Sequence, residues 1–207
     1  MKHKLLKNIA LALLMLAAMP FAQAQVAVGD ILCSDGQILT TSTYPSSGAT
    51  AIGVVFYVDG TGQHGWAVAL QDAGSFNWGP PYDTPLGNYQ NNRQAVYDLD
   101  GYQNTQVIRQ YGTNYPVFYA VDFDNGWYLP AIGQLNYLYG NLVEVNAGLE
   151  VTGGAPFEMD SDWRYWSSTE HSDYHAWYLF STGELNYHYN GTNDKAYGWR
   201  VRGVKNF

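Results

Sequence analysis

The clearest hydrophobic pattern in the chain is a pair of apolar runs separated by a glycine-rich turn. Residues Ala51 to Val58 are mostly β-branched, small or aromatic, and Asp59-Gly60-Thr61-Gly62 follows them directly. A second apolar run, Gly65 to Leu70, comes after that turn. Two such runs around a turn that contains glycine are typical of a β-hairpin. We therefore predict two antiparallel strands in this part of the chain.

A first helix is predicted where the apolar spacing changes from two residues to three. Thr105, Ile108 and Tyr111 recur at helical intervals, Asn104 is a suitable capping residue, and Gly112 ends the run. Spacing of this kind, with a polar residue before it and a glycine after it, indicates one short amphipathic helix.

A second helix is predicted after Pro130, because proline is tolerated in the first turn of a helix. Leu135, Leu138 and Leu142 then form a stripe that a core-facing helix would bury. We expect this helix to end near Gly140, with a further helical turn after it.

The remaining segments read as strands and loops. Residues 71–90 are rich in proline and glycine and predict a long ordered loop, whereas 117–121 predict a strand. Residues 165–204 alternate short apolar runs with turns, of which 181–184 indicates a hairpin turn and 190–194 a loop. Two helices set among antiparallel strands predict the α+β class.

The first residues of the chain have the pattern of a secretory signal. Three lysines precede the apolar stretch Ile9 to Ala18, which is too short for a comfortable membrane span, and Ala22-Gln23-Ala24 offers a cleavage site. We expect residues 1–24 to be removed, 25–50 to form an extended arm and 51–207 to form one domain. The mature protein would then be secreted, periplasmic or on the outer cell surface.

Charge and cysteine content narrow the classes of partner. Loss of the signal leaves seven basic and eighteen acidic side chains, a net charge of −11. An acidic surface of this kind disfavours nucleic acids and anionic membranes as partners, and no membrane insertion of the mature form is expected. Cys33 is the only cysteine, so it cannot form an internal disulfide, and we expect it to be a small buried hydrophobe.

A spaced run of aromatic motifs in the last part of the chain carries a family resemblance. It comprises Gly126-Trp127-Tyr128-Leu129-Pro130, Tyr165-Trp166-Ser167-Ser168-Thr169, Ala176-Trp177, Gly183 and Arg200-Val201-Arg202. This run resembles bacterial C-type-lectin-like domains at the C-terminus of collagen-like adhesins and the Fibrobacter-type paralogous domain, which are distantly similar to sulfatase-modifying-factor domains. The resemblance implies a C-type-lectin-like fold, with two short helices, antiparallel sheets and long ordered loops. It also implies an exported binding module.

The sequence contains none of the common catalytic motifs. Sulfatase-modifying relatives use a pair of cysteines, and Cys33 alone cannot supply it; a nucleophile elbow, a phosphate loop and a zinc-protease helix are also missing. Glu158, Asp160, Asp162 and Glu170 are the acids from which a polysaccharide hydrolase would draw a carboxylate pair. In an acidic protein we interpret them instead as solvated loop charges, and we expect no enzyme activity.

Two groups of residues are candidate metal ligands. His171 and His175 are four apart, but the residues between them indicate a loop entering a strand, where this spacing does not align two imidazoles. Asp122, Asp124 and Asn125 form an oxygen-rich turn that calcium would accept, although such a turn needs no ion to explain it. No cofactor is predicted, and calcium is the one metal alternative.

Some of the motif residues are expected to stabilise the scaffold. Trp127, Trp166, Trp177 and Trp199 occupy family-wide motif positions and are interpreted as core. Residues 167–169 are expected to satisfy backbone groups around a bend.

The terminal arginines are also expected to be structural. Arg200 and Arg202 alternate with Val201, which predicts that they share one face in an ion pair or at a rim.

Recognition is expected to lie between the motifs, where tyrosine, histidine and asparagine gather. Tyrosine offers a large contact area at low entropic cost, and small polar residues add adaptable hydrogen bonds. The predicted ligand-binding residues are Tyr174, His175, Asn186, Tyr187, His188, Asn190 and Asn193. The expected partner is a glycan or a surface protein of a host or bacterial cell. The alternatives are a structural or adhesive component of a fimbria-like surface assembly, or a polysaccharide hydrolase.

Overall fold

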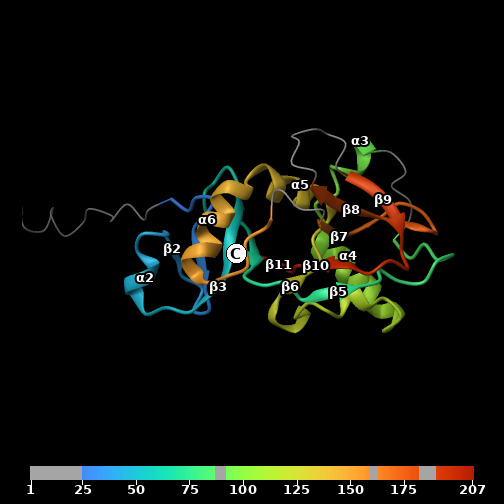
Figure 1. The fold of residues 1–207 in the computed structure, drawn as a ribbon, viewed down its shortest axis with the longest axis horizontal. Helices are drawn as coiled ribbons and strands as arrows, with labels where there is room; N and C mark the ends of the chain where they lie inside the picture. The colour runs from blue at the N-terminus through green and yellow to red at the C-terminus, as the bar shows by residue number, and fades with distance from the viewer. Residues whose placement is uncertain (1–24, 87–91, 159–162, 182–189) are drawn as a thin grey trace, which may run out of the picture.

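The structure, a computed structural model, describes residues 25–86, 92–158, 163–181 and 190–207, and its elements are shown in Figure 1. One sheet has six strands in the order β2-β1-β3-β4-β11-β6, and every pair in it is antiparallel. Its strands are β1 (Ile31–Cys33), β2 (Ile38–Leu39), β3 (Ala51–Val58), β4 (Gly65–Ala69), β6 (Trp127–Tyr128) and β11 (Val204–Asn206). The predicted hairpin is β3–β4, and Val54 lies opposite Val68.

The N-terminal segment is part of this sheet. Ile31, Leu32 and Cys33 of β1 are buried, and β1 pairs with both β2 and β3. This differs from the extended arm expected for residues 25–50, because a three-residue strand is too short to stand out from its polar neighbours. Burial of Cys33 confirms its expected role as a small hydrophobe and raises the pKa of its thiol. The segment continues into the short helix α2 (Tyr44–Ser47).

The second sheet has five strands in the order β5-β10-β7-β8-β9. Its strands are β5 (Gly74–Phe76), β7 (Trp163–Glu170), β8 (His175–Ser181), β9 (Asn190–Asp194) and β10 (Trp199–Val201). The β10–β7 pair is parallel and the other pairs are antiparallel. The loop expected at 190–194 was wrong, because these residues pair with β8 as a strand.

The described helices outnumber the two that were predicted. They are α2, α3 (Asn92–Ala95), α4 (Gly101–Ile108), α5 (Ile132–Gly140) and α6 (Leu142–Thr152), with 3-10 turns η1 (Arg109–Tyr111), η2 (Pro116–Phe118) and η3 (Phe123–Asn125). The class is nevertheless α+β, as expected. No helix in the described part of the chain is long and apolar enough to span a membrane.

Two local expectations in this region need correction. Helix α4 begins at Gly101 rather than after Asn104, whose side chain instead donates to Asp98 and Ser168. The strand expected at 117–121 is replaced by η2, because Pro116 lacks the N–H that a sheet ladder needs and starts a 3-10 turn. Gly112, at φ +92°, ends the helical segment as predicted.

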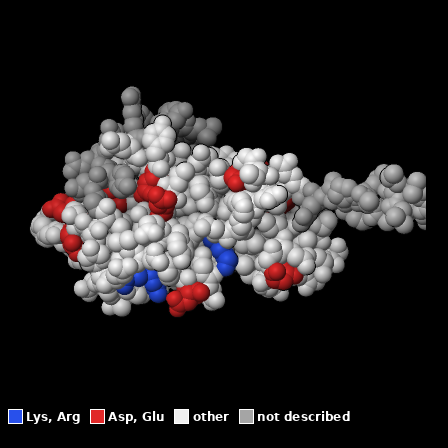
Figure 2. All heavy atoms as spheres, turned by 180° about the vertical axis from the view of Figure 1, so that it is seen from behind, with Lys and Arg blue, Asp and Glu red and all other residues white. Residues whose placement is uncertain are grey.

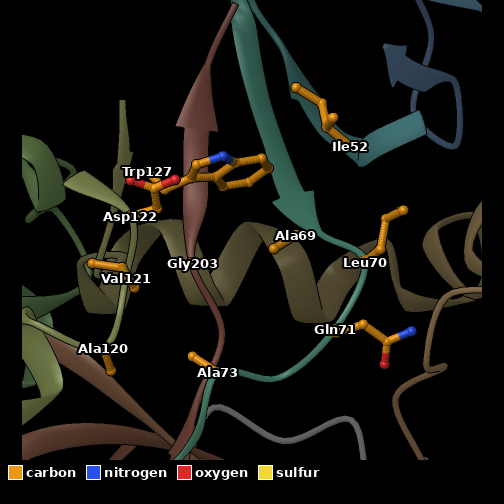
Figure 3. Close-up of a pocket in the computed structure, with 10 residues that line it drawn as sticks. All are labelled: Ile52, Ala69, Leu70, Gln71, Ala73, Ala120, Val121, Asp122, Trp127 and Gly203. Atoms are coloured by element: carbon orange, nitrogen blue, oxygen red, sulfur yellow. The ribbon is translucent and has the colours of Figure 1, made fainter. Parts of the chain in front are cut away.

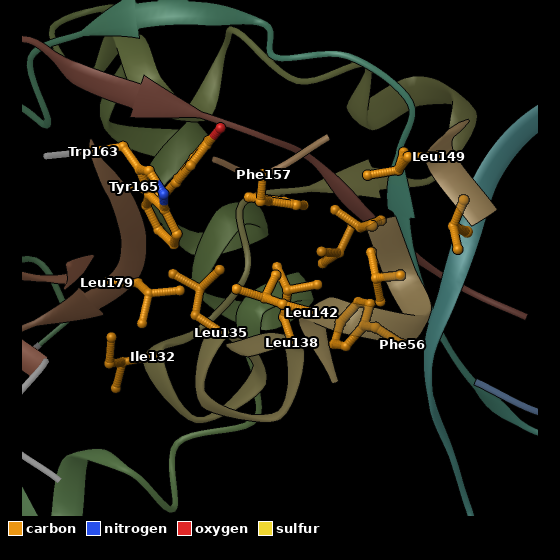
Figure 4. Packing of buried hydrophobic residues seen from close by; sticks show 14 of the residues in the cluster. Phe56, Ile132, Leu135, Leu138, Leu142, Leu149, Phe157, Trp163, Tyr165 and Leu179 are labelled. Carbon is orange, nitrogen blue, oxygen red and sulfur yellow. The ribbon is translucent and has the colours of Figure 1, made fainter. Parts of the chain in front are cut away.

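Helix α5 forms the centre of the core. It contacts β3 of the six-stranded sheet and both β7 and β8 of the five-stranded sheet. Leu135 and Leu138 of α5 and Leu142 of α6 are buried, as their spacing predicted. Figure 4 shows them beside Phe157 and Tyr165, so one hydrophobic cluster joins the two sheets.

The Ser-Ser-Thr segment lies inside β7 and connects it to a buried polar network. The Thr169 hydroxyl donates to Asp98 at 2.7 Å and accepts from the N–H of Ile132 at 2.9 Å. The Ser167 hydroxyl donates to the carbonyl of Trp177 at 2.7 Å, where the register of β7 and β8 is shifted. These side chains do satisfy backbone groups, as expected.

The terminal arginine motif forms the predicted buried ion pair. Arg202 is 3% exposed, and its Nε lies 2.5 Å from the carboxylate of Asp72. Its guanidinium also packs over Phe157 at 4.1 Å and donates to the carbonyl of Ala155. Arg200 lies at the rim, 4.0 Å from both Asp72 and Glu158.

Candidate functional site

The structure separates the seven predicted ligand-binding residues into three groups. Tyr174 and His175 lie in the turn between β7 and β8 and at the start of β8, and both are half-buried. Asn190 and Asn193 have their backbone in β9, but their side chains are outside the described part. Asn186, Tyr187 and His188 fall outside the described residues altogether.

A second segment, not predicted as part of a site, lies against this turn. Residues 77–86, here called the 77–86 loop, follow β5, and the N–H of Tyr82 donates to the carbonyl of Asp173 at 2.8 Å. The rings of Tyr82 and Tyr174 meet edge to face with centroids 4.5 Å apart. We refer to the 77–86 loop and the 171–175 turn together as the paired loops. They form the candidate site.

Tyr82 has an unusual backbone conformation and is highly exposed. Its φ is +68°, the only positive value at a non-glycine residue in the described chain, and 72% of its surface is accessible to solvent. A bulky residue in the left-handed region costs on the order of 1–3 kcal/mol, and such strain clusters at functional sites. An exposed aromatic ring gains little stability from burial, so the fold is holding this side chain outward at a cost.

The 77–86 loop is fixed from beneath by a buried ion pair. Lys195 Nζ lies 2.5 Å from Glu170 Oε1, and both side chains are fully inaccessible to solvent. The second Glu170 oxygen accepts the N–H of Leu86 at 2.9 Å, and Lys195 donates to the carbonyl of Asp83 at 2.5 Å. The pair therefore holds the loop at two points on either side of residues 84 and 85.

Burial of this pair has an electrostatic consequence. Desolvation raises the pKa of the Glu170 carboxyl, and the hydrogen bond and charge of Lys195 partly oppose that rise. Lys195 also lies 4.8 Å above the ring of Trp78, which adds a cation–π contact. Glu170 was expected to be a solvated loop acid, and that expectation was wrong.

Aromatic packing fixes the start of the same loop. Trp78 is buried; its indole N–H donates to the carbonyl of Ser167 at 2.8 Å, and its backbone N–H donates to the carbonyl of Lys195 at 2.7 Å. Tyr115 meets Trp78 edge to face and donates its hydroxyl to the carboxylate of Asp83. Desolvation, followed by the nearby Asp83, raises the pKa of the Tyr115 hydroxyl, so it stays a donor.

The 171–175 turn is closed by its own hydrogen bonds. The Ser172 hydroxyl accepts from the N–H groups of Tyr174 and His175 and lies 3.2 Å from His175 Nδ1. The backbone N–H groups of His171 and Ser172 both donate to the carbonyl of His175. These hydrogen bonds hold the turn, and with it the backbone of Tyr174, in a fixed conformation.

Among the described residues, His171 and His175 are not joined by further side chains that could complete a metal centre. The rings of His171 and His175 are 5.9 Å apart at 76°, and burial with the nearby His175 lowers the pKa of His171. His171 Nδ1 is buried and has no hydrogen-bond partner among the described residues. Over the same residues no group of three or more His, Cys, Asp and Glu side chains is placed to hold a metal ion.

The oxygen-rich turn uses its groups internally. The Asn125 amide donates to the carboxylate of Asp122 at 2.7 Å, and the ammonium of Lys205 donates to the carbonyl of Asn125. Asp124 points to Arg109, with 3.9 Å between the charged atoms. The carbonyl oxygen of Asn125 is thus already used by the ammonium of Lys205.

Among the described residues, the four acids considered for hydrolysis do not form a carboxylate pair. Glu158 is exposed beside Arg200, whereas Glu170 is neutralised by Lys195 in the interior. Asp160 and Asp162 lie outside the described residues.

The motif tryptophans are divided between core and surface. Trp166 and Trp177 are buried, as expected, but Trp127 and Trp199 are only partly buried. Sequence reasoning also missed Tyr82, Asp83 and Lys195. The signal available for Tyr82 was its position after Pro80-Pro81 in a loop rich in turn residues, where a large exposed ring is unusual.

Comparison with known proteins gives a fold relationship. No protein-family model matches the sequence, and no curated protein matches it. The chain is similar to the crystal structure of a fimbrial protein from Bacteroides ovatus, with a TM-score of 0.63, 17% sequence identity and coverage of 88% of this chain. The match covers 49% of the fimbrial protein, so this chain spans about half of its length. At this identity the similarity concerns the fold, which is thus one that also occurs in a fimbrial protein.

Proposed function

We propose that this protein is an exported, non-enzymatic component of a fimbria-like surface assembly and makes adhesive contacts through the paired loops. The observation that carries the proposal is the pair formed by the exposed Tyr82 and the half-buried Tyr174, on a loop held by a buried ion pair in a fold shared with a fimbrial protein. The fold similarity to a fimbrial protein supports a place in a surface assembly, and the paired loops supply the aromatic side chains for contact.

The paired loops have the properties of a preorganised contact surface. Binding through a flexible loop costs conformational entropy for each side chain that becomes ordered. Here the Lys195–Glu170 pair and the Tyr82 N–H bond to Asp173 hold the loop before any partner arrives. Tyrosine then offers a broad ring and a hydroxyl with few rotatable bonds. Rigid support and exposed aromatic area together favour contact over catalysis.

The charge distribution agrees with contact through uncharged groups. The face seen in Figure 2 is mostly uncharged, with acidic and basic side chains in small separate groups. Only 14% of the residues are charged, whereas 16% are aromatic. Contacts between such surfaces rely on aromatic packing and neutral hydrogen bonds more than on ion pairs.

A second candidate function is recognition of a glycan by the same surface. The specific observation in its favour is that the rings of Tyr82 and Tyr174 meet, and that the Tyr174 ring lies 6.1 Å from the imidazole of His175, which contacts the Ser172 hydroxyl. Sugar rings stack their C–H faces on aromatic side chains while their hydroxyls bond to neighbouring polar groups.

The test of the assembly proposal is made in the bacterium that produces the protein. We expect an epitope-tagged chain to be accessible to protease on whole cells and to migrate in a surface fraction of high mass. Deletion of the chain should reduce attachment of the cells, and the wild-type chain should restore it. Recovery of the chain only as a free monomer inside the cell envelope would contradict the proposal.

The glycan alternative has its own test. Purified protein is applied to a glycan array beside the Tyr174→Ala variant and a matched surface control, Tyr97→Ala, since Tyr97 is 82% exposed on another segment. Glycan recognition predicts binding that Tyr174→Ala reduces at least tenfold and Tyr97→Ala leaves unchanged. Binding of no glycan, or equal binding by all three proteins, removes this alternative and leaves the assembly proposal in place.

A further inference from the structure

A pocket at the turn end of the β3–β4 hairpin combines aromatic and polar side chains. Its volume is about 360 Å³, near the lower end of the range for ligand pockets, which suits a single ring-sized group. The aromatic lining residues are Tyr57, Trp66 and Phe207, and the polar ones are Asp59, His64 and Asn206. These residues belong to the six-stranded sheet and its turn, whereas the paired loops are attached to strands of the five-stranded sheet. The hairpin pocket is therefore separate from the candidate site.

Tyr57 and Trp66 form one aromatic wall of the hairpin pocket. They lie opposite each other in β3 and β4, and their rings stack with centroids 4.2 Å apart at an angle of 26°. Tyr137 of α5 packs against both rings, with its centroid 4.8 Å from that of Tyr57 and 5.9 Å from that of Trp66. Both strand residues are only partly buried, so the wall keeps surface open to solvent. Its rings are held in place before a ligand arrives, which lowers the entropic cost of binding.

Phe207 forms a second aromatic wall, and Gly65 makes room for it. The backbone N–H groups of Gly65 and Phe207 each donate to the carbonyl of the other residue, at 3.3 and 3.2 Å. A Cβ atom added to Gly65 would lie 2.6 Å from Cζ of the Phe207 ring and would also meet the carbonyl oxygen of Tyr57. The bare backbone at Gly65 thus lets the Phe207 ring lie across the strand.

Asn206 supplies a hydrogen-bond donor whose orientation is set from the interior. Its Oδ1 accepts the hydroxyl of Tyr128 at 2.6 Å, and that hydroxyl accepts from the amide of Gln134 at 2.9 Å. Because the oxygen is bound to Tyr128, the NH2 group is the part of this exposed side chain that can meet a ligand.

Asp59 supplies acceptors and is fixed by its own turn. Its Oδ1 accepts from the Thr61 hydroxyl at 2.6 Å and from the N–H groups of Thr61 and Gly62. The Thr61 hydroxyl is the main cause that lowers the pKa of the carboxyl below its ordinary value, so Asp59 is ionised at neutral pH. A carboxylate can accept about four hydrogen bonds, so Asp59 can also accept a hydroxyl from a ligand. The exposed His64 adds an imidazole that can donate or accept.

This combination of groups distinguishes between classes of ligand. A sugar ring stacks its C–H faces on aromatic side chains, and its hydroxyls both donate and accept hydrogen bonds. A quaternary ammonium ion instead needs aromatic faces directed at one centre, whereas Tyr57 and Trp66 turn one face toward each other. The ionised Asp59 disfavours sugars that carry carboxylate or sulfate groups, because like charges repel.

A second pocket shows what the polar groups add. Figure 3 shows it around Trp127, with a lining of small and aliphatic side chains that includes Ile52 and Leu70. Its charged lining residue, Asp122, already accepts the amide of Asn125. That pocket offers mainly apolar surface, so a ligand rich in hydroxyl groups fits the hairpin pocket better.

We infer that the hairpin pocket binds one neutral sugar ring against Trp66 and Phe207. The Asp59 carboxylate accepts hydrogen bonds from the sugar hydroxyls, and the Asn206 amide donates to them. The inference goes beyond the proposed function, because the site uses none of the residues of the paired loops. One molecule would then make two separate contacts, one through the loops and one through the hairpin pocket.

The experiment applies the exported, processed protein to an array of neutral oligosaccharides of glucose, galactose, mannose and N-acetylhexosamines, beside sialylated and sulfated glycans. We expect neutral glycans to bind, and calorimetric titration of the best one gives the dissociation constant. Trp66→Ala removes an aromatic wall, and Asn206→Asp keeps an acceptor for Tyr128 while replacing the donor. Each should weaken binding at least tenfold. Asn114→Asp makes the same charge change at an exposed position on another segment and should bind as the wild type.

Several results would overturn the inference. They are binding of no neutral glycan, preference for the anionic glycans, tighter binding of choline than of any sugar, and an Asn206→Asp variant that binds as the wild type. Phe207→Ala replaces Trp66→Ala if circular dichroism shows that the latter does not fold. Tyr174→Ala should leave binding unchanged, and a loss there would place the sugar on the paired loops instead. None of these results alters surface location or cell attachment, so the inference fails separately from the proposed function.

Discussion

The buried Lys195–Glu170 pair leads to a prediction about stability that can be worked out from the structure. Replacing Lys195 with methionine keeps most of its volume and leaves the Glu170 carboxyl without its partner in a fully buried site. Removing one member of a buried ion pair costs about 3–5 kcal/mol, because the remaining charge stays desolvated. For a protein of this length, 1 kcal/mol shifts the melting temperature by about 2–4 °C. We therefore expect Lys195→Met to lower the melting temperature by about 10 °C.

The same variant should show a characteristic dependence on pH. Burial raises the pKa of Glu170 above its value of 4.5 in the unfolded chain, and removal of Lys195 raises it further. A carboxyl with a raised folded-state pKa binds its proton more tightly when folded, so its contribution to stability is present below pH 4.5. That contribution is lost as the pH rises through the folded-state pKa. The destabilisation of Lys195→Met should thus be greater near neutral pH than in acid.

The assay is urea unfolding of the wild type and the variants near pH 4.5 and near neutral pH. Lys205→Met is the matched control, because Lys205 is a partly exposed lysine whose ammonium donates to the carbonyl of the exposed Asn125 and lies 5.9 Å from the ring of Trp127, and exposed charges contribute about 1 kcal/mol or less. The double variant Glu170→Met with Lys195→Met should lose less than the sum of the two single changes, since it leaves no unpaired charge. A Lys195→Met variant as stable as Lys205→Met, or equally destabilised at both pH values, would refute the reasoning.

Three further predictions concern single contacts in the scaffold. Thr169→Val removes the hydroxyl that joins Asp98 to the N–H of Ile132, and chemical denaturation should show a loss of about 1–3 kcal/mol. Gly148→Ala places a Cβ atom 2.6 Å from Val54 and should destabilise the protein by about 1–3 kcal/mol, measured by the same method. Gly140→Ala, at the end of α5 where nothing lies within 4 Å, should be neutral or stabilising by up to about 1 kcal/mol; a similar loss at both glycines would contradict the close approach of Gly148 to Val54.

The parts of the fold that could be predicted are those in which a local pattern coincides with the final environment. The β3–β4 hairpin and the leucine stripe of α5 follow from two- and three-residue periodicities that tertiary packing reinforces. By contrast, β1 and β9 are short or polar segments whose strand conformation depends on partners elsewhere in the chain. Backbone pairing of this kind leaves no periodic trace in the sequence.

Of the paired loops, only Tyr174 and His175 were predicted from the sequence. Tyr174 and His175 were found because they lie among other polar and aromatic residues near the family motifs. Tyr82 was missed because its contact with Tyr174 joins residues 92 positions apart and because its positive φ cannot be read from the residue type. Residue types indicate which amino acids a contact surface contains, but they do not indicate which distant segments of the chain form it together.

Whether Glu170 is solvated or buried depends on a partner that lies far away in the sequence. An acid near a turn in an acidic protein is normally solvated, and only the distant Lys195 makes this one a buried member of an ion pair. Natural proteins retain such pairs although an apolar replacement is often as stable, so stability alone is a weak reason for its presence. What the pair adds is directional hydrogen bonding to Asp83 and Leu86, which apolar side chains cannot supply.

The double methionine variant should therefore keep its fold while losing the fixed position of Tyr82. Adhesion that falls in this stable variant would tie the buried pair to contact rather than to folding.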